Sequence, residues 1–151
     1  MKSRIFIAVQ LTLVLFCFAC TKARIEPDYS VYGDKAFVNS INTFYYKEVK
    51  SNLNYGEQVT GYQKLTVTNT QSIDNANKKI NIVLAKATGA DLTDLTKIGI
   101  AINTDAQRVE PINGAPIAGL IGDFSKGPYT YRLFSANGTT RDWTLTFSIT
   151  P

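Results

Sequence analysis

Apolar and polar residues alternate with a period of two through much of the chain after residue 36. The clearest example is Asp142–Ile149, where Trp, Leu, Phe and Ile alternate with Thr and Ser. The stretch Tyr129–Phe134 has the same pattern, and Asn137-Gly138 between the two is typical of a tight hairpin turn. Because successive side chains of a strand point to opposite faces, this pattern predicts a C-terminal hairpin with one face in a core.

Four more segments predict strands by the same alternation. Lys79–Lys86 and Lys97–Asn103 each place Ile or Leu on one face, and Gln63–Asn69 buries Leu65 and Val67. The segment 36–49 has apolar residues on both faces, so its register is ambiguous. Gly99, inside the second of these segments, indicates either a bulge or a close backbone approach.

The connections are rich in turn-forming residues. Loops are expected at 52–61, 74–78 and 113–127, and a single helical turn capped by Asp91 at 90–95. Six or so short strands separated by such loops predict an all-β fold, an antiparallel β-sandwich, with no α/β organisation.

The first 19 residues follow a different pattern, that of a secretory signal. Lys2 and Arg4 precede an apolar run of 15 residues, Ile5–Ala19, which is short of the roughly 20 residues that span a bilayer. We favour a cleaved signal peptide over an uncleaved anchor, because the run ends in Phe-Ala-Cys20 and turns polar at once.

That ending resembles the lipobox of bacterial lipoproteins, in which a small residue precedes an invariant cysteine. Ala19 and Cys20 match, whereas Cys17 stands where Leu is usual and Phe18 is bulkier than usual. The resemblance implies diacylglycerol on the Cys20 thiol, cleavage before it and acylation of the new amine. Several acyl chains suffice for stable membrane anchoring. Cys20 is then a lipidation site, and no free thiol remains.

The expected organisation is a signal peptide at 1–19, a lipidated cysteine and tether at 20–32 and one sandwich domain at 33–151. Surface-exported lipoproteins of Bacteroidota typically carry acidic residues after the cysteine. Here the residues are basic, Lys22 and Arg24. We therefore interpret the chain as an outer-membrane lipoprotein of the cell envelope. The sequence does not decide between the periplasmic side and the surface side of that membrane.

Charge excludes one class of partner. The chain has 16 basic and 12 acidic residues, and loss of Lys2 and Arg4 with the signal leaves 14 against 12. A surface so close to neutral has no footprint for nucleic acid.

The hydrophobic content of 44% is enough for a packed core.

The strand and turn pattern resembles the immunoglobulin-like modules of Bacteroidota lipoproteins. The likeness lies in Ile41–Phe44, in 79–84 followed by 91–95 and 98–102, in Val109–Pro111 and in the C-terminal hairpin. The segment 47–71 is an extra or lengthened part. The resemblance implies an immunoglobulin-like sandwich that serves as a spacer or binding module, often in proteins linked to glycan uptake.

Candidate chemistry is scarce. The chain has no histidine, so neither Ser-His-Asp catalysis nor a His-ligated zinc site is expected, and we predict no catalytic residue, cofactor or metal. Glycoside hydrolysis needs only two carboxylates and is the least favoured alternative. Five aspartates beside loops or turns are interpreted as turn and cap residues: Asp74, Asp91, Asp105, Asp123 and Asp142. Asp91 and Asp94 form a weak Ca²⁺ candidate.

Tyrosines are the more informative feature. Tyr45, Tyr46, Tyr55 and Tyr62 fall in the first half of the domain, and exposed tyrosine rings offer large contact area at low entropic cost. Tyr46 and Tyr55 are the candidate ligand-binding residues, with core packing as the alternative, whereas Trp143, Tyr129 and Tyr131 are expected in the core.

The leading hypothesis from sequence is a non-catalytic, lipid-anchored envelope protein that binds a glycan or a partner protein. The alternative is a structural accessory subunit of an outer-membrane assembly. It predicts an apolar patch or an open strand edge.

Overall fold

The structure is a computed structural model of the 151-residue chain, and it describes residues 27–53, 56–85, 92 and 95–150. This part of the chain consists of one 3₁₀ turn, η1, followed by eight strands. Their bounds are η1 Tyr29–Tyr32, β1 Val38–Leu53, β2 Gly56–Val67, β3 Asn69–Asp74, β4 Lys79–Leu84, β5 Ile98–Thr104, β6 Arg108–Ile112, β7 Tyr129–Phe134 and β8 Thr140–Ile149.

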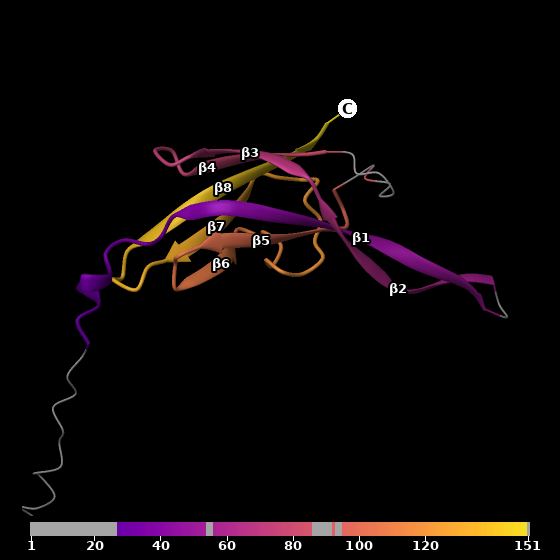
Figure 1. Cartoon of the computed structure of the whole chain (residues 1–151), viewed down its shortest axis with the longest axis horizontal. Helices are drawn as coiled ribbons and strands as arrows, with labels where there is room; N and C mark the ends of the chain where they lie inside the picture. The colour runs from indigo at the N-terminus through magenta and orange to yellow at the C-terminus, as the bar shows by residue number, and fades with distance from the viewer. Residues whose placement is uncertain (1–26, 54–55, 86–91, 93–94, 151) are drawn as a thin grey trace, which may run out of the picture.

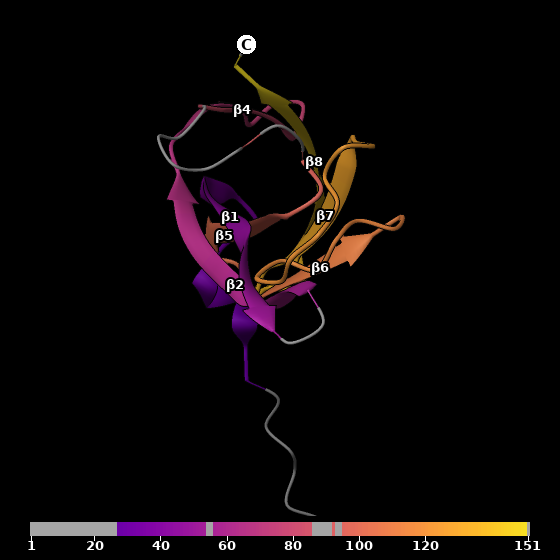
Figure 2. The same cartoon turned by 90° about the vertical axis from the view of Figure 1, so that its right-hand side faces the viewer.

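The strands form two sheets that pack face to face. One sheet has three strands in the order β2-β1-β5, and the other has five in the order β3-β4-β8-β7-β6. Figure 1 shows the two layers on either side of the core, and Figure 2 shows β2, β1 and β5 facing β8, β7 and β6. The predicted all-β sandwich is thus confirmed. Pairing is antiparallel throughout these strands except between β4 and β8, which run parallel, so the expectation of a wholly antiparallel sandwich was wrong at that pair.

One hydrophobic cluster joins the sheets. The inner faces supply apolar residues at every second position, as the alternation predicts. The largest side chains of this cluster with almost no exposed surface are Trp143, Tyr131, Phe124, Ile41, Ile80, Ile82, Leu84, Leu92, Ile98, Ile100, Leu133 and Leu145. Trp143, Tyr129 and Tyr131 lie in the core, as predicted.

The C-terminal hairpin has the predicted strands. β7 pairs with β8 across a loop in which Gly138 has a φ of 87°, a conformation that glycine adopts without steric cost. Asn137 contributes through its side chain, whose Oδ1 accepts the Thr139 N–H at 3.0 Å. The loop closes with a 2.8 Å bond from Ser135 N–H to the Thr139 carbonyl.

Chain segments outside the strands complete the packing. Trp143 donates its indole N–H to the Ala36 carbonyl at 3.1 Å, and the Ser135 hydroxyl joins Lys35 N–H and the Gly33 carbonyl. These bonds fix the chain just before β1 against the β7–β8 hairpin. Asp34 also pairs with Arg141.

Two sequence expectations about the elements were wrong, and one strand was not predicted. The expected loop at 52–61 is largely strand, because the β1–β2 hairpin continues past the sandwich, where no core pattern marks it. The expected strand Gln63–Asn69 is split, since β2 ends at Val67 and β3 begins at Asn69. β6 was not predicted as a strand because it contains Pro111, which a sheet edge tolerates. The turn at 74–78 is confirmed, while the helical turn at 90–95 falls mostly outside the described residues.

The long connection from β6 to β7 covers a sheet edge. Gly119 donates its N–H to the Ile100 carbonyl at 2.8 Å, and Gly122 exchanges two backbone bonds with Ile98. We call the segment 115–122 the strap, since it lies along the outer side of β5.

Candidate functional site

The outer face of the three-stranded sheet carries a row of aromatic rings. In β1, Tyr45 is buried on the inner side, so Phe44 and Tyr46 lie on the outer side. Tyr62 of β2 is directly opposite Glu48 and shares that face, and 54% of its surface is exposed. We call Phe44, Tyr46 and Tyr62 the outer aromatic face.

The two tyrosines are diagonal neighbours across the strand pair. Tyr46 is opposite Lys64 and Glu48 is opposite Tyr62. Diagonal positions of antiparallel strands lie about 7–8 Å apart, within reach of aromatic side chains. The two rings therefore flank one area of the sheet.

Gly99 makes room for the Tyr46 ring. A methyl group placed on Gly99 would lie 2.7 Å from Tyr46 Cε2 and 3.2 Å from the Leu120 carbonyl oxygen of the strap. The sequence analysis left a bulge or a close approach open at Gly99, and the structure shows the close approach. Tyr46 is half-buried as a result.

Charged groups surround the rings. Lys97 Nζ lies 2.6 Å from Glu48 Oε1, and its hydrogen bond holds the pKa of Glu48 below the usual range. Lys64 Nζ lies 3.8 Å from the centre of the Phe44 ring, in cation–π geometry. The face thus combines apolar rings with groups that can donate and accept hydrogen bonds.

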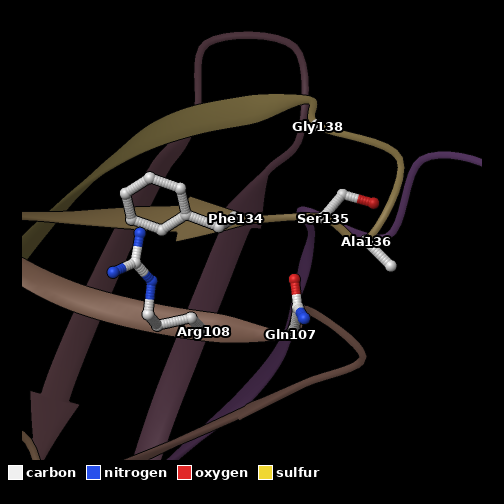
Figure 3. A pocket seen from close by; sticks show the side chains of 6 residues that line it. All are labelled: Gln107, Arg108, Phe134, Ser135, Ala136 and Gly138. Carbon is white, nitrogen blue, oxygen red and sulfur yellow. The ribbon is translucent and has the colours of Figure 1, made fainter. Parts of the chain in front are cut away.

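A second feature is an open depression at the far end of the five-stranded sheet (Figure 3). It has a volume of about 550 Å³ and is lined by Gln107, Arg108, Phe134, Ser135, Ala136 and Gly138. The Arg108 guanidinium lies 4.0 Å from the Phe134 ring centre and 2.6 Å from Glu110. The guanidinium, which is the main charged group of the depression, is therefore already bound by Phe134 and Glu110. No carboxylate is among the residues that line the depression.

The structure describes only some of the predicted site residues. Tyr46 lies on the outer aromatic face, where Tyr62 joins it, whereas Tyr45 is a core residue. Cys20 and Tyr55 lie outside the described residues, as do Asp91 and Asp94. The structure therefore brings Tyr46 together with one tyrosine that was not singled out.

The aspartates take two roles. Asp74 accepts the N–H groups of Ala76 and Asn77 at 3.0 Å, and Asp123 accepts that of Ser125 at 2.8 Å, so both are turn residues as predicted. Hydrogen bonds lower the pKa of both carboxyl groups. Asp142 was misassigned to a turn: it lies within β8 and binds Arg132 of β7 through two bonds of 2.7 and 2.8 Å.

Sequence reasoning missed Phe44, Glu48, Lys64 and Lys97 as neighbours of Tyr46. Phe44 and Tyr46 are two positions apart, which was a usable signal for a shared face. Lys64 of β2 and Lys97, which directly precedes β5, had no such signal, because their position near Tyr46 depends on which strands lie beside β1.

Neither a cluster of metal-binding side chains nor a membrane-spanning helix is found in the described part of the chain. No group of three or more acidic, histidine or cysteine residues is arranged to hold a metal ion there. Among the same residues, no helix has the length and apolar character needed to cross a membrane.

Comparisons with known proteins place the chain in a family. It is similar to a crystal structure from Bacteroides fragilis NCTC 9343, described as a "putative secreted protein", with a TM-score of 0.61 and 17% identity over 83% of this chain and 100% of the other. This likeness concerns the fold. No curated protein matches the chain. The model of the family described as DUF5018-related matches residues 38–146, which span β1 to most of β8, and the chain belongs to the DUF5018-related family.

Proposed function

We propose that the mature chain is a non-catalytic, lipid-anchored protein of the bacterial cell envelope that binds a glycan on its outer aromatic face. The observation that carries the binding proposal is the placing of Tyr46 and Tyr62 on one outer face, beside the Glu48–Lys97 ion pair. Pyranose rings present a flat C–H face and a rim of hydroxyls. Tyrosine rings stack against the first, and the charged pair hydrogen-bonds the second.

The envelope location is supported from two sides. The leader at 1–19 ends in a lipobox-like Ala19-Cys20, and the structural relative from Bacteroides fragilis is described as secreted. The same proposal includes an immunoglobulin-like fold for the domain and an outer-membrane location for the protein, because both rest on the resemblance to Bacteroidota lipoproteins.

Mass spectrometry of the protein purified from its native membrane tests the anchor. The expected N-terminus is an acylated Cys20, and Cys20→Ser should abolish acylation because no thiol is left at that position. Cys17→Ser is the matched control and should leave the acylated product unchanged. An unmodified N-terminus in the natural protein would contradict the proposal.

Glycan binding is tested on an array with the processed protein in detergent. Tyr62→Ala and Tyr46→Ala should each weaken binding of the selected glycan by about five- to thirtyfold, since loss of a stacked ring removes roughly 1–2 kcal/mol. Tyr32→Ala is the control, because Tyr32 is 59% exposed but belongs to η1. Equal losses in all three variants, or no glycan selected at all, would refute the site.

A second candidate function rests on the strap. Ile117, Leu120 and Ile121 are 58%, 57% and 43% exposed within five positions, and exposed apolar clusters often mark contacts with other proteins. This observation favours an accessory subunit of an envelope assembly. Ile117→Asp should then release a protein that co-purifies with the natural chain, and co-purification that survives the change would remove this candidate.

A further inference from the structure

The outer side of β2 is an open strand edge. β2 ends the three-stranded sheet, and its 12 residues pair with β1 on the other side only. Figures 1 and 2 show the β1–β2 hairpin reaching beyond the sandwich, with no other described strand along this side. We call this side, from residue 56 to 67, the β2 edge.

Two of the other three edge strands are protected, and the third, β3, has 6 residues against 12 in β2. The strap covers the outer side of β5 through its bonds to Ile98 and Ile100, and the edge strand β6 contains Pro111. β2 is the longer strand and has no proline. An edge of this kind is a template for pairing with another strand.

The backbone direction shows which residues of β2 face the edge. Tyr46 donates its N–H to Lys97, away from β2, so by alternation Tyr45 and its partner Leu65 bond each other. Tyr62 and Lys64 then point their backbone groups to the edge. The register shifts by one residue at Val49/Lys50 because β2 has one extra residue there.

Past this bulge, Val59 and Glu57 also face the edge. Their partners on β1 are Lys50 and Asn52. Glu57 lies 3.4 Å from Lys50, and the two side chains are 62% and 46% exposed. The four edge-facing residues Glu57, Val59, Tyr62 and Lys64 all have side chains on the outer face.

These four residues are self-complementary. If a second copy pairs antiparallel about a two-fold axis between Thr60 and Gly61, Glu57 faces Lys64 of the second copy and Val59 faces Tyr62 of the second copy. Each match occurs twice because of the symmetry. Opposite charges and aromatic–β-branched pairs are the favourable cross-strand combinations. A shift by two residues puts Val59 opposite Lys64, or Glu57 opposite Tyr62, and loses both matches.

We propose that two copies of this chain associate through the β2 edge in this register and form one continuous six-stranded sheet. The dimer needs no ligand, so the proposal stands or falls separately from glycan binding.

Cysteine cross-linking tests the register in the full-length, membrane-anchored chain. Gln58 and Gln63 face each other between copies as a non-hydrogen-bonded pair, with Cα atoms about 4.5 Å apart, a separation that a disulfide accepts. Within one strand the two positions are about 16 Å apart, so a bond between them joins two chains. Q58C/Q63C should give a product of twice the chain mass on a non-reducing gel.

The control is Q58C/T66C, which moves one cysteine out of register by three residues and to the opposite face of the sheet, and leaves Glu57, Val59, Tyr62 and Lys64 unchanged. It should cross-link at a small fraction of the rate of Q58C/Q63C. Equal rates for the two variants, no product, or a product with a mass other than twice that of the chain would overturn the proposal.

Charge exchange gives an independent check in the Q58C/Q63C background. Glu57→Lys or Lys64→Glu alone should reduce the cross-linking rate roughly tenfold, because two like-charged pairs replace two ion pairs. The combined exchange should restore the rate. Glu110→Lys on β6 makes the same change in net charge and should have no effect. Absence of rescue by the combined exchange, with Trp143 fluorescence showing a folded protein, would contradict the pairing.

Discussion

At the scale of single residues, glycine and tyrosine together shape the candidate site. The Tyr46 ring lies where a side chain on Gly99 would be, and the Leu120 carbonyl of the strap closes the same space. The absence of a Cβ at position 99 therefore sets how deeply the ring is buried.

Gly99→Ala should destabilise the fold by about 1–2 kcal/mol and turn the Tyr46 ring outward. The added methyl group would overlap Tyr46 Cε2, and it would lie too close to the Leu120 carbonyl oxygen, which is part of the backbone. Denaturant unfolding followed by Trp143 fluorescence measures the first effect, and glycan affinity the second. Gly61→Ala is the matched control in β2, since a methyl there meets nothing within 4 Å. Similar losses for both variants would show that the close approach is not the cause.

Buried polar side chains in the described part of the chain form hydrogen bonds within the protein. Tyr131 donates its hydroxyl hydrogen to the Pro116 carbonyl at 2.6 Å, and burial raises the pKa of this phenol. In the described part of the chain, every buried side-chain nitrogen and oxygen has a hydrogen-bond partner. Such a satisfied interior is typical of packing, and it leaves the exposed tyrosines as the better ligand candidates.

At the scale of elements, the crossing from β2 to β3 is one of three connections between the two sheets. β2 leaves β1 at Val67, so the β1 backbone at Ile41 has no strand partner on that side. Gln71 accepts the Ile41 N–H at 2.7 Å, and Asn69 donates to the Ile41 carbonyl at 3.0 Å. Two side chains of β3 thus continue the hydrogen bonding that a strand would have made.

Gln71→Ala should cost about 1–3 kcal/mol, because it leaves the Ile41 N–H without an acceptor beside a buried side chain. Chemical denaturation of the variant and the natural protein gives this difference. Gln58→Ala, at an exposed position of the hairpin, should change stability by less than about 0.5 kcal/mol. A Gln71 variant as stable as the control would mean that water replaces the side chain.

At the scale of the whole molecule, charge and acid sensitivity follow from the carboxyl groups. Glu48, Asp74, Asp123 and Asp142 all have a lowered pKa, caused first by hydrogen bonds from their neighbours. A carboxyl group with a lower pKa in the folded state contributes stability above its unfolded pKa of about 4, and this contribution is lost as the pH falls through the folded value.

The melting temperature should therefore stay nearly constant between about pH 5 and 8, where the absence of histidine leaves little to titrate, and fall below about pH 4. Asp142→Asn should lower stability at pH 7 by no more than about 1 kcal/mol, since the pair with Arg132 is solvent-exposed, and by less at pH 3. A melting temperature that rises on acidification would reverse the assigned sign.

Much of this fold follows from local sequence. The alternation in 129–134 and 142–149, with Asn137-Gly138 between, defines a hairpin because the side-chain period and the turn both act over a few residues. The same alternation identifies the core residues, including Trp143. It fails at β6, where proline masks the strand, and beyond the sandwich in β2, where neither face is buried.

What the sequence determined by itself is the class of fold, the membership of the core and the scarcity of catalytic side chains, because these depend on pattern and composition. Only the tertiary structure decided that β4 and β8 run parallel, that Tyr46 and Tyr62 share an outer face, and that the β2 edge stays open. Each of these depends on which strands become neighbours, and that choice is made by the packing of the whole core around chain segments far apart in sequence.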